Sequence, residues 1–115
     1  MAVDDDIETV KIFNFFLQKQ GYEAIVANSV PEAMAHLESV VPNVLLLDLM
    51  LPGLNGEELL KHIRQTPNLA DIFVIIVSAH EYDPSKLPTG IAPDAIIRKP
   101  IRITQLSETI SKALA

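Results

Sequence analysis

The feature that most constrains the fold of this chain is a pair of uninterrupted apolar segments, residues 44–47 and 73–77. Neither segment alternates apolar with polar side chains, as a strand with one solvent-facing side would. Such segments are typical of strands in a parallel sheet that is buried on both faces. Residues 95–97 predict a third strand of the same kind.

Segments with helical periodicity separate these strands. Apolar side chains recur every three or four residues from Ile7 to Leu17, and Gly21 follows where a helix is expected to end. A strand is predicted over residues 22–27. After it, Ser29 and Glu32 have the spacing of a capping box, which predicts the start of a second helix.

Two further helices are predicted later in the chain. A loop marked by Pro52, Gly53 and Gly56 leads into the first of them, which Asn55 can cap, and Thr104 can cap the last. The side chains predicted to face the core from all four helices are Ile7, Val10, Phe13, Leu17, Ala33, Met34, Leu37, Leu60, Ile63, Leu106, Ile110 and Leu114.

Strands that alternate with helices predict a single α/β domain over residues 1–115, with a parallel sheet covered on both sides. Two stretches fit this pattern poorly. Only Met1, Ala2 and Val3 precede the first acidic residues, so the first strand is either unusually short or clipped in a domain excised from a longer protein. Residues 82–94 contain three prolines and a glycine, so any helix there is short or irregular.

Composition excludes several classes of protein. The chain has no cysteine, which rules out disulfides, thiolate metal sites and cysteine nucleophiles. Its formal charge of −6 argues against a nucleic-acid-binding surface, which needs clustered lysine and arginine. No apolar run approaches the ~20 residues that span a bilayer, and the acidic start does not resemble an export signal. We therefore expect an acidic, cytoplasmic module that binds neither nucleic acid nor membrane.

Polar residues follow the predicted strands at their carboxyl ends. Three aspartates occupy positions 4–6 after the first strand, Asp48 follows residues 44–47, and Ser78 follows residues 73–77. Arg98 and Lys99 follow the last strand. In open α/β sheets, ligands bind at this edge, near the point where the strand order reverses. The fold would therefore bring carboxylates, a hydroxyl and an ammonium together from distant parts of the chain.

These groups are chemically complementary. Crowded carboxylates raise one another's pKa unless a cation lies between them. An oxygen-only set suits Mg²⁺, which keeps several waters and binds through one or two carboxylates together with phosphate oxygens. A carboxylate can attack phosphorus to form an acyl phosphate, while the metal and Lys99 neutralise charge on the moving phosphoryl group. The pattern therefore predicts phosphoryl transfer to an aspartate.

Each of these residues taken alone also has an ordinary structural explanation. Asp4 and its two neighbours could cap the first helix and favour its dipole, and Asp48 could start a turn. Ser78 could be a strand-end hydroxyl, and Lys99 could be a solvated charge before a proline. The three histidines lack metal-ligand spacing and are assigned no chemistry. The functional interpretation rests on all four strand ends matching at once.

The sequence resembles the receiver domains of two-component response regulators over nearly its whole length. The resemblance is carried by residues 3–5, residues 21–23, the Asp-Leu-Met-Leu-Pro-Gly stretch at 48–53 with Gly56, residues 77–79, and Lys99 with Pro100. It implies a flavodoxin-like, doubly wound α/β fold, with a five-stranded parallel sheet in the order 2-1-3-4-5 and helices on both faces. The Lys99–Pro100 peptide bond is expected to be cis.

The resemblance also implies a Mg²⁺ site and a phosphoacceptor. Asp48 would accept the phosphoryl group and help to bind the metal. Asp5 would bind Mg²⁺ directly, Asp4 largely through water, and Met50 through its backbone carbonyl. Asp6 would lie outside the first coordination sphere.

The phosphoryl group and its donor follow from the same resemblance. Ser78 would hydrogen-bond a phosphoryl oxygen, and Lys99 would ion-pair with it. The donor would be a phosphohistidine of a sensor histidine kinase or a histidine phosphotransfer protein, docked partly on the helix that begins near Ile7. Phosphorylation would switch the conformation and the binding of a downstream output domain or protein, which the sequence does not identify.

Two departures from the family pattern leave a second function open. Ile96 occupies the position, three before the lysine, where receivers usually carry an aromatic residue, and the proline-rich 82–94 segment takes the place of a usual helix. All the reacting residues are present, but signalling through this face is placed in doubt. The alternative is a phosphorylation-independent pseudo-receiver that acts as a protein-interaction module.

The first predicted helix carries three phenylalanines. We expect Phe13, Phe15 and Phe16 all to be core residues, with exposure of one for a partner as the alternative.

Two other functions of similar folds are disfavoured by the sequence. An aspartate-nucleophile phosphatase usually carries a second aspartate where this chain has Met50, so we expect only self-catalysed phosphorylation and slow self-dephosphorylation. A flavodoxin-like cofactor binder would share the fold, but the chain has no tryptophan and no evident phosphate-cradling loop.

Overall fold

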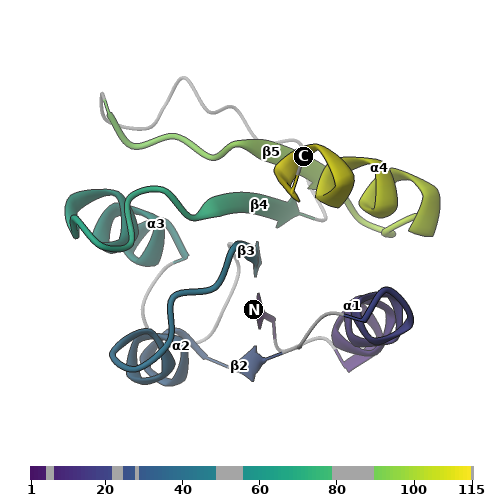
Figure 1. Ribbon diagram of the computed structural model, residues 1–115, viewed down its shortest axis with the longest axis horizontal. Coiled ribbons are helices and arrows are strands. Elements are labelled where there is room, and N and C mark those ends of the chain that lie inside the picture. Colours follow the sequence, from purple (N-terminus) through teal and green to yellow (C-terminus); the bar gives the residue numbers. More distant parts are fainter. Residues whose placement is uncertain (5–6, 22–24, 28, 49–55, 79–89, 115) are drawn as a thin grey trace.

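The computed structural model describes residues 1–4, 7–21, 25–27, 29–48, 56–78 and 90–114. Their five strands form one parallel sheet in the order β2-β1-β3-β4-β5, which confirms the predicted fold class (Figure 1). The strands are β1 (Ala2–Val3), β2 (Val26–Ala27), β3 (Val44–Asp48), β4 (Phe73–Ser78) and β5 (Ala95–Arg98).

Helices cover both faces of the sheet. They are α1 (Ile7–Lys19), α2 (Val30–Leu37), α3 (Gly56–Gln65) and α4 (Ile103–Leu114). Figure 1 shows α2 and α3 on one side of the sheet and α1 and α4 on the other. The short or irregular helix expected within residues 82–94 falls mainly on positions 79–89, which lie outside the described residues, and residues 90–94 are not helical.

Strands β3 and β4 are buried on both faces of the sheet, as their apolar sequences predict. Successive side chains of a strand point to opposite faces, so Leu45 and Leu47 join the core beneath α2 and α3. Val44 and Leu46 join the second core, beneath α1 and α4. Burying a leucine side chain fully stabilises a fold by roughly 1.5–3 kcal/mol, so the apolar strands supply much of the stability of the sheet.

The first strand is as short as its sequence suggests, yet it occupies the second position in the sheet. Met1 also pairs with β3, because its amino group donates to the Val44 carbonyl at 2.8 Å and its carbonyl accepts from the Leu46 amide at 2.7 Å. Asp4 continues the pairing on the other side, where its amide donates to the Ala27 carbonyl. Backbone hydrogen bonds to both neighbours therefore fix the direction in which the chain leaves β1.

The helix ends confirm two sequence predictions and correct one. Gly21 follows α1 with a φ of 79°, a conformation that glycine adopts without the steric cost of a Cβ. The Ser29 side chain accepts a hydrogen bond from the Glu32 amide at the start of α2. The prediction that Thr104 caps the last helix is wrong, because α4 begins at Ile103 and Thr104 lies within its first turn. The predicted cap Asn55 lies outside the described residues.

The phenylalanines of α1 divide between the core and the surface. Phe13 and Phe16 are buried, whereas 55% of Phe15 is exposed. The preferred interpretation that all three lie in the core is therefore wrong for Phe15, because the helical repeat turns position 15 away from the face formed by positions 13 and 16. None of the helices in the described ranges has the length and apolar character that a bilayer crossing requires.

Candidate functional site

Three polar side chains are buried at one edge of the sheet. Asp4 is fully inaccessible to solvent, and Asp48 and Ser78 are each 6% exposed. Within the described ranges, no other polar or charged residue is buried to this degree. Burying a carboxylate costs free energy unless it is paired or hydrogen-bonded, so this concentration of polar groups points to a functional site.

The strand register explains why residues so far apart in sequence meet. Val3 pairs with Leu47 across β1 and β3, so Asp4 and Asp48 are the next residues on neighbouring strands. Asp48 in turn pairs with Val77, the residue before Ser78. Because all strands are parallel, their carboxyl ends lie at the same edge of the sheet.

Lys99 reaches this edge from β5. Its backbone amide donates to the Ser78 carbonyl at 2.8 Å, which extends the pairing of β4 and β5 by one residue. The Lys99 ammonium nitrogen lies 3.1 Å from an Asp4 carboxylate oxygen and 3.1 Å from an Asp48 carboxylate oxygen. The Lys99–Pro100 peptide bond is cis, as the resemblance to receiver domains implies.

The two carboxylates determine the protonation of this lysine. Burial alone would lower the pKa of the Lys99 ammonium, but hydrogen bonds to Asp4 and Asp48 and their negative charges outweigh that effect and raise it. Lys99 is therefore protonated at neutral pH. One ammonium between two carboxylates leaves this group of three side chains with a net charge of about −1.

The chemistry of these residues fits a magnesium ion. Mg²⁺ binds proteins through one or two carboxylates and retains several waters, and Asp4 and Asp48 supply two buried carboxylates at the same edge of the sheet. Asp5, Asp6 and Met50 lie outside the described residues. In the part of the chain that the structure describes, no group of three or more histidine, cysteine or acidic side chains gathers as metal ligands would.

Near this edge the structure adds two neighbour relations that the sequence does not show. Arg98, the last residue of β5, is exposed and pairs in register with Ser78. Ile103 at the start of α4 is 49% exposed, and surface depressions are lined by Ile103 together with Phe15 of α1. The charge of Arg98 was visible in the sequence, but its neighbour on β4 was not. The meeting of Phe15 with Ile103 depends on packing between helices that are far apart in the chain.

The fold and the buried acidic cluster define a doubly wound α/β domain with its polar site at the carboxyl edge of the sheet. The family profile of the response regulator receiver domain matches residues 1–111. The chain therefore belongs to the receiver domain family of two-component response regulators.

Individual relatives agree with this assignment. The polar-differentiation response regulator DivK of Brucella ovis is 32% identical, over 99% of this chain and 94% of DivK. The alkaline phosphatase synthesis transcriptional regulatory protein PhoP of Bacillus subtilis is 28% identical, over 99% of this chain and 47% of PhoP. The chain spans about half the length of the first curated relatives that it matches.

A solved structure supports the same fold. The CheY-like response regulator receiver domain protein from Methanospirillum hungatei JF-1 superposes with a TM-score of 0.85 at 30% sequence identity. The match covers 98% of this chain and 90% of that structure.

Proposed function

We propose that this receiver domain, acting as one unit over residues 1–115, is phosphorylated on Asp48 in a Mg²⁺-dependent reaction and thereby switches its binding to an output domain or protein. The observation that carries the proposal is the position of Asp48, which is buried at the strand edge with its carboxylate 3.1 Å from the Lys99 ammonium. A nucleophile held beside a fixed cation is suited to accept a phosphoryl group, because the cation stabilises the negative charge of the group as it is transferred.

The reaction follows from the chemistry of the carboxylate. An Asp48 oxygen attacks phosphorus, the phosphorus–nitrogen bond of a phosphohistidine breaks, and the donor imidazole leaves with the bonding electrons. Lys99 holds the transferred oxygens by charge, and the Ser78 hydroxyl donates to one of them. When bound, Mg²⁺ neutralises phosphoryl charge, and Asp4, Asp5, Asp48 and the backbone carbonyl of Met50 would hold it.

We infer that the domain works in the cytoplasm and turns over no external substrate. It catalyses only its own phosphorylation and slow dephosphorylation. The donor is a histidine kinase or a histidine phosphotransfer protein. Transient ordering around the new phosphoryl group shifts an equilibrium between two conformations, and this shift is read by the output partner.

Intact-mass measurement after incubation with Mg²⁺ and a small-molecule phosphodonor tests the proposal. We expect a single phosphoryl adduct that disappears in Asp48→Asn and when the metal is chelated. Asp71→Asn is the matched control, since Asp71 is an exposed aspartate outside the site, and it should retain the adduct. Undiminished labelling of folded Asp48→Asn would refute the assignment.

The protein donor is expected to dock on α1 and the start of α4. Phe15 and Ile103 form an exposed apolar centre there, and Lys11 and Lys19 lie beside it. The Lys19 ammonium lies 4.7 Å from the centre of the Phe15 ring, a cation–π distance that holds the ring in place on the surface. This surface suits a helix of the donor with apolar and acidic side chains.

A comparison of two phosphodonors tests the docking surface. Phe15→Ala should slow transfer from the protein donor and leave phosphorylation by a small molecule unchanged. Val41→Ala, at a comparably exposed valine outside this surface, is the control and should slow neither reaction. Equal slowing of both reactions in Phe15→Ala would show that the change disturbs the fold, contrary to a docking role.

Ile96 favours a second candidate function, a receiver that binds its partner without phosphorylation. This residue is aliphatic and 38% exposed on β5, where receivers usually carry the aromatic side chain that responds to phosphorylation. Partner affinity measured with and without a phosphoryl mimic separates the candidates. Clearly tighter binding with the mimic excludes the phosphorylation-independent module, and equal binding supports it.

A further inference from the structure

A cavity with a volume of about 230 Å³ lies at the amino end of the sheet, opposite the proposed phosphorylation site. Met1, Ile25 and Asn43 line it, and each of them directly precedes a strand, which places the cavity at this end. Among the residues that the structure describes, nine apolar residues and Asn43 form the lining.

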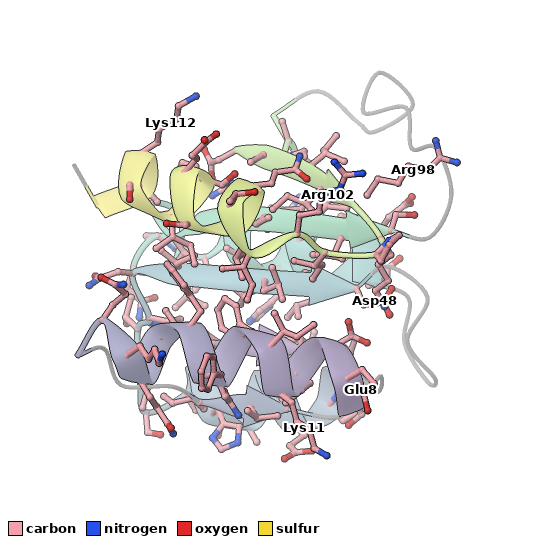
Figure 2. The ribbon with its side chains drawn as sticks, turned by 90° about the vertical axis from the view of Figure 1, so that its right-hand side faces the viewer. Glu8, Lys11, Asp48, Arg98, Arg102 and Lys112 are labelled. Atoms are coloured by element: carbon pink, nitrogen blue, oxygen red, sulfur yellow. The ribbon has the colours of Figure 1, made fainter. Side chains whose placement is uncertain are left out.

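The lengths of the helices and strands explain why space remains there. Figure 2 shows Glu8 of α1 near Asp48 and Lys112 of α4 at the opposite end, so both helices run along the sheet to its amino end. They have 13 and 12 residues, whereas β1 and β2 have two residues each. The short strands therefore fill only part of the space beneath the last turns of the two helices.

The inner wall of the cavity is buried and its mouth is apolar as well. Phe13 and Leu17 of α1 and Ile110 of α4 line the inner wall and are at most 6% exposed. Val40 and Val41 lie at the mouth and are 37% and 52% exposed. Two adjacent exposed valines beside an apolar depression are typical of a surface that binds another molecule.

The lining also restricts the charge of a ligand. None of the described lining residues has a charged side chain. The Met1 amino group donates to the Val44 carbonyl at 2.8 Å, and burial lowers its pKa to about 6, so it is neutral at pH 8. A charged ligand would lose its hydration here without gaining a partner of opposite charge. Asn43, which is exposed, is the one described lining residue with a polar side chain.

We propose that this cavity binds a small uncharged aromatic molecule of about two fused rings with one hydrogen-bonding group, of which indole is the simplest example. An apolar cavity of about 150 Å³ can hold benzene, so the larger volume here suits a bicyclic ring. The ring contacts Phe13 and Leu17, Val41 covers it at the mouth, and Asn43 accepts from its N–H group. The inference does not depend on phosphorylation of Asp48.

Titration of the nitrogen-15-labelled full chain with indole at pH 8, followed through the backbone amide signals in NMR spectra, tests the inference. We expect saturable shifts for the amides of Val41, Asn43 and Val44, with a Kd of about 0.1–1 mM, and unchanged signals near Lys99. Indole-3-acetate has the same ring system and an added carboxylate, and should bind about tenfold more weakly or worse.

A pair of matched variants tests the position of the site. Val41→Asp should raise the Kd for indole by about fivefold or more, because the new carboxylate at the mouth must lose water when the ligand enters. Ile103→Asp is the control, since Ile103 is 49% exposed, lies outside this cavity and undergoes the same change of charge. It should leave the Kd within about twofold. Both positions are exposed, so both variants should fold.

Several outcomes would overturn the inference. Absent or non-saturating shifts, or equal binding of indole and indole-3-acetate, would show that the cavity does not select this class of ligand. Equal weakening by Val41→Asp and Ile103→Asp would place the binding elsewhere. If the amides of residues 41–44 shift on dilution of the ligand-free protein, a second copy of the chain covers the mouth. None of these results bears on phosphorylation of Asp48, which intact mass measures separately.

Discussion

The two ends of the parallel sheet each join a cation to an aspartate, but they balance their charges differently. At the amino end, Arg64 of α3 donates to the carbonyls of Ala70, Ile72 and Ala92 and to the Asp94 carboxylate, at 2.7–3.0 Å. One guanidinium thereby ties α3 to the segments that lead into β4 and β5. Its charge is matched by one carboxylate.

At the carboxyl end, by contrast, one ammonium serves two buried carboxylates. At the amino end, one Asp94 carboxylate oxygen accepts hydrogen bonds from both the Arg64 guanidinium and the Val74 amide, and these two donors stabilise its negative charge. Asp4 and Asp48 share the Lys99 ammonium, which lies 3.1 Å from an oxygen of each carboxylate. The comparison indicates that the guanidinium at the amino end mainly joins structural elements, whereas the carboxyl end concentrates two buried carboxylates around one ammonium, as functional sites often do.

The largest expected effect is at the amino end. Arg64→Met should lower the free energy of unfolding by about 3 kcal/mol, because three carbonyls and a carboxylate lose their donor in a partly buried position. Urea denaturation measures the change. Arg64→Lys should recover only part of the loss, since a single ammonium cannot reach all four acceptors.

Phosphorylation of the Arg64→Met variant tests whether the amino and carboxyl ends of the sheet act independently. At temperatures where this variant is folded, we expect the Asp48 adduct to form at nearly the usual extent. A loss of stability below about 0.5 kcal/mol would contradict the structural role assigned to the amino end. Loss of the adduct in the folded variant would show that the two ends are coupled.

The amino group of Met1, which lies at the amino end of the sheet beside Val44, should make the free energy of unfolding depend on pH. Burial lowers the pKa of this group from 8.0 to about 6. Between these values the unfolded chain binds a proton that the folded chain does not, so the free energy of unfolding decreases as the pH falls from 8 to 6 and recovers as the pH rises. The change is about 2–3 kcal/mol, since one pKa unit corresponds to about 1.4 kcal/mol.

Acetylation of the Met1 amino group isolates this contribution, because the acetylated group no longer titrates. Denaturation of the acetylated and the free chain over the same pH range should show the additional dependence only in the free chain. Parallel curves for the two forms would mean that the amino group keeps its ordinary pKa in the folded state. In that case the Met1 amino group would make no pH-dependent contribution to stability at the amino end of the sheet.

The smallest effect on stability is expected at the carboxyl end. Asp4→Asn removes one of two carboxylates that compete for Lys99, so the free energy of unfolding in metal-free buffer should stay equal or rise by up to about 1 kcal/mol. The same change should strongly reduce Mg²⁺-dependent phosphorylation. A loss of 2 kcal/mol or more would show that the Asp4–Lys99 pair is mainly structural, and would weaken the contrast between the two ends.

Much of the site was predictable because local patterns define it. Uninterrupted apolar segments mark the buried strands, and in a parallel sheet the residues after them must meet at one edge. Asp4, Asp48 and Lys99 do meet there, and Ser78 is buried beside them, although their chemical roles stay predictions. The start of α4 was misplaced by two residues, because a cap at Thr104 would start the helix at position 105, whereas α4 begins at Ile103.

The class of fold and the edge of the sheet that carries the polar residues follow from local patterns, because periodicity and strand ends are read over a few residues. Tertiary packing is needed to place one ammonium between two carboxylates, to bring Arg64 to Asp94 at the opposite end of the sheet, and to pair Arg98 in register with Ser78. These contacts join residues that no local pattern relates. Their geometry depends on strand register and helix packing, which the cooperative burial of the whole core determines.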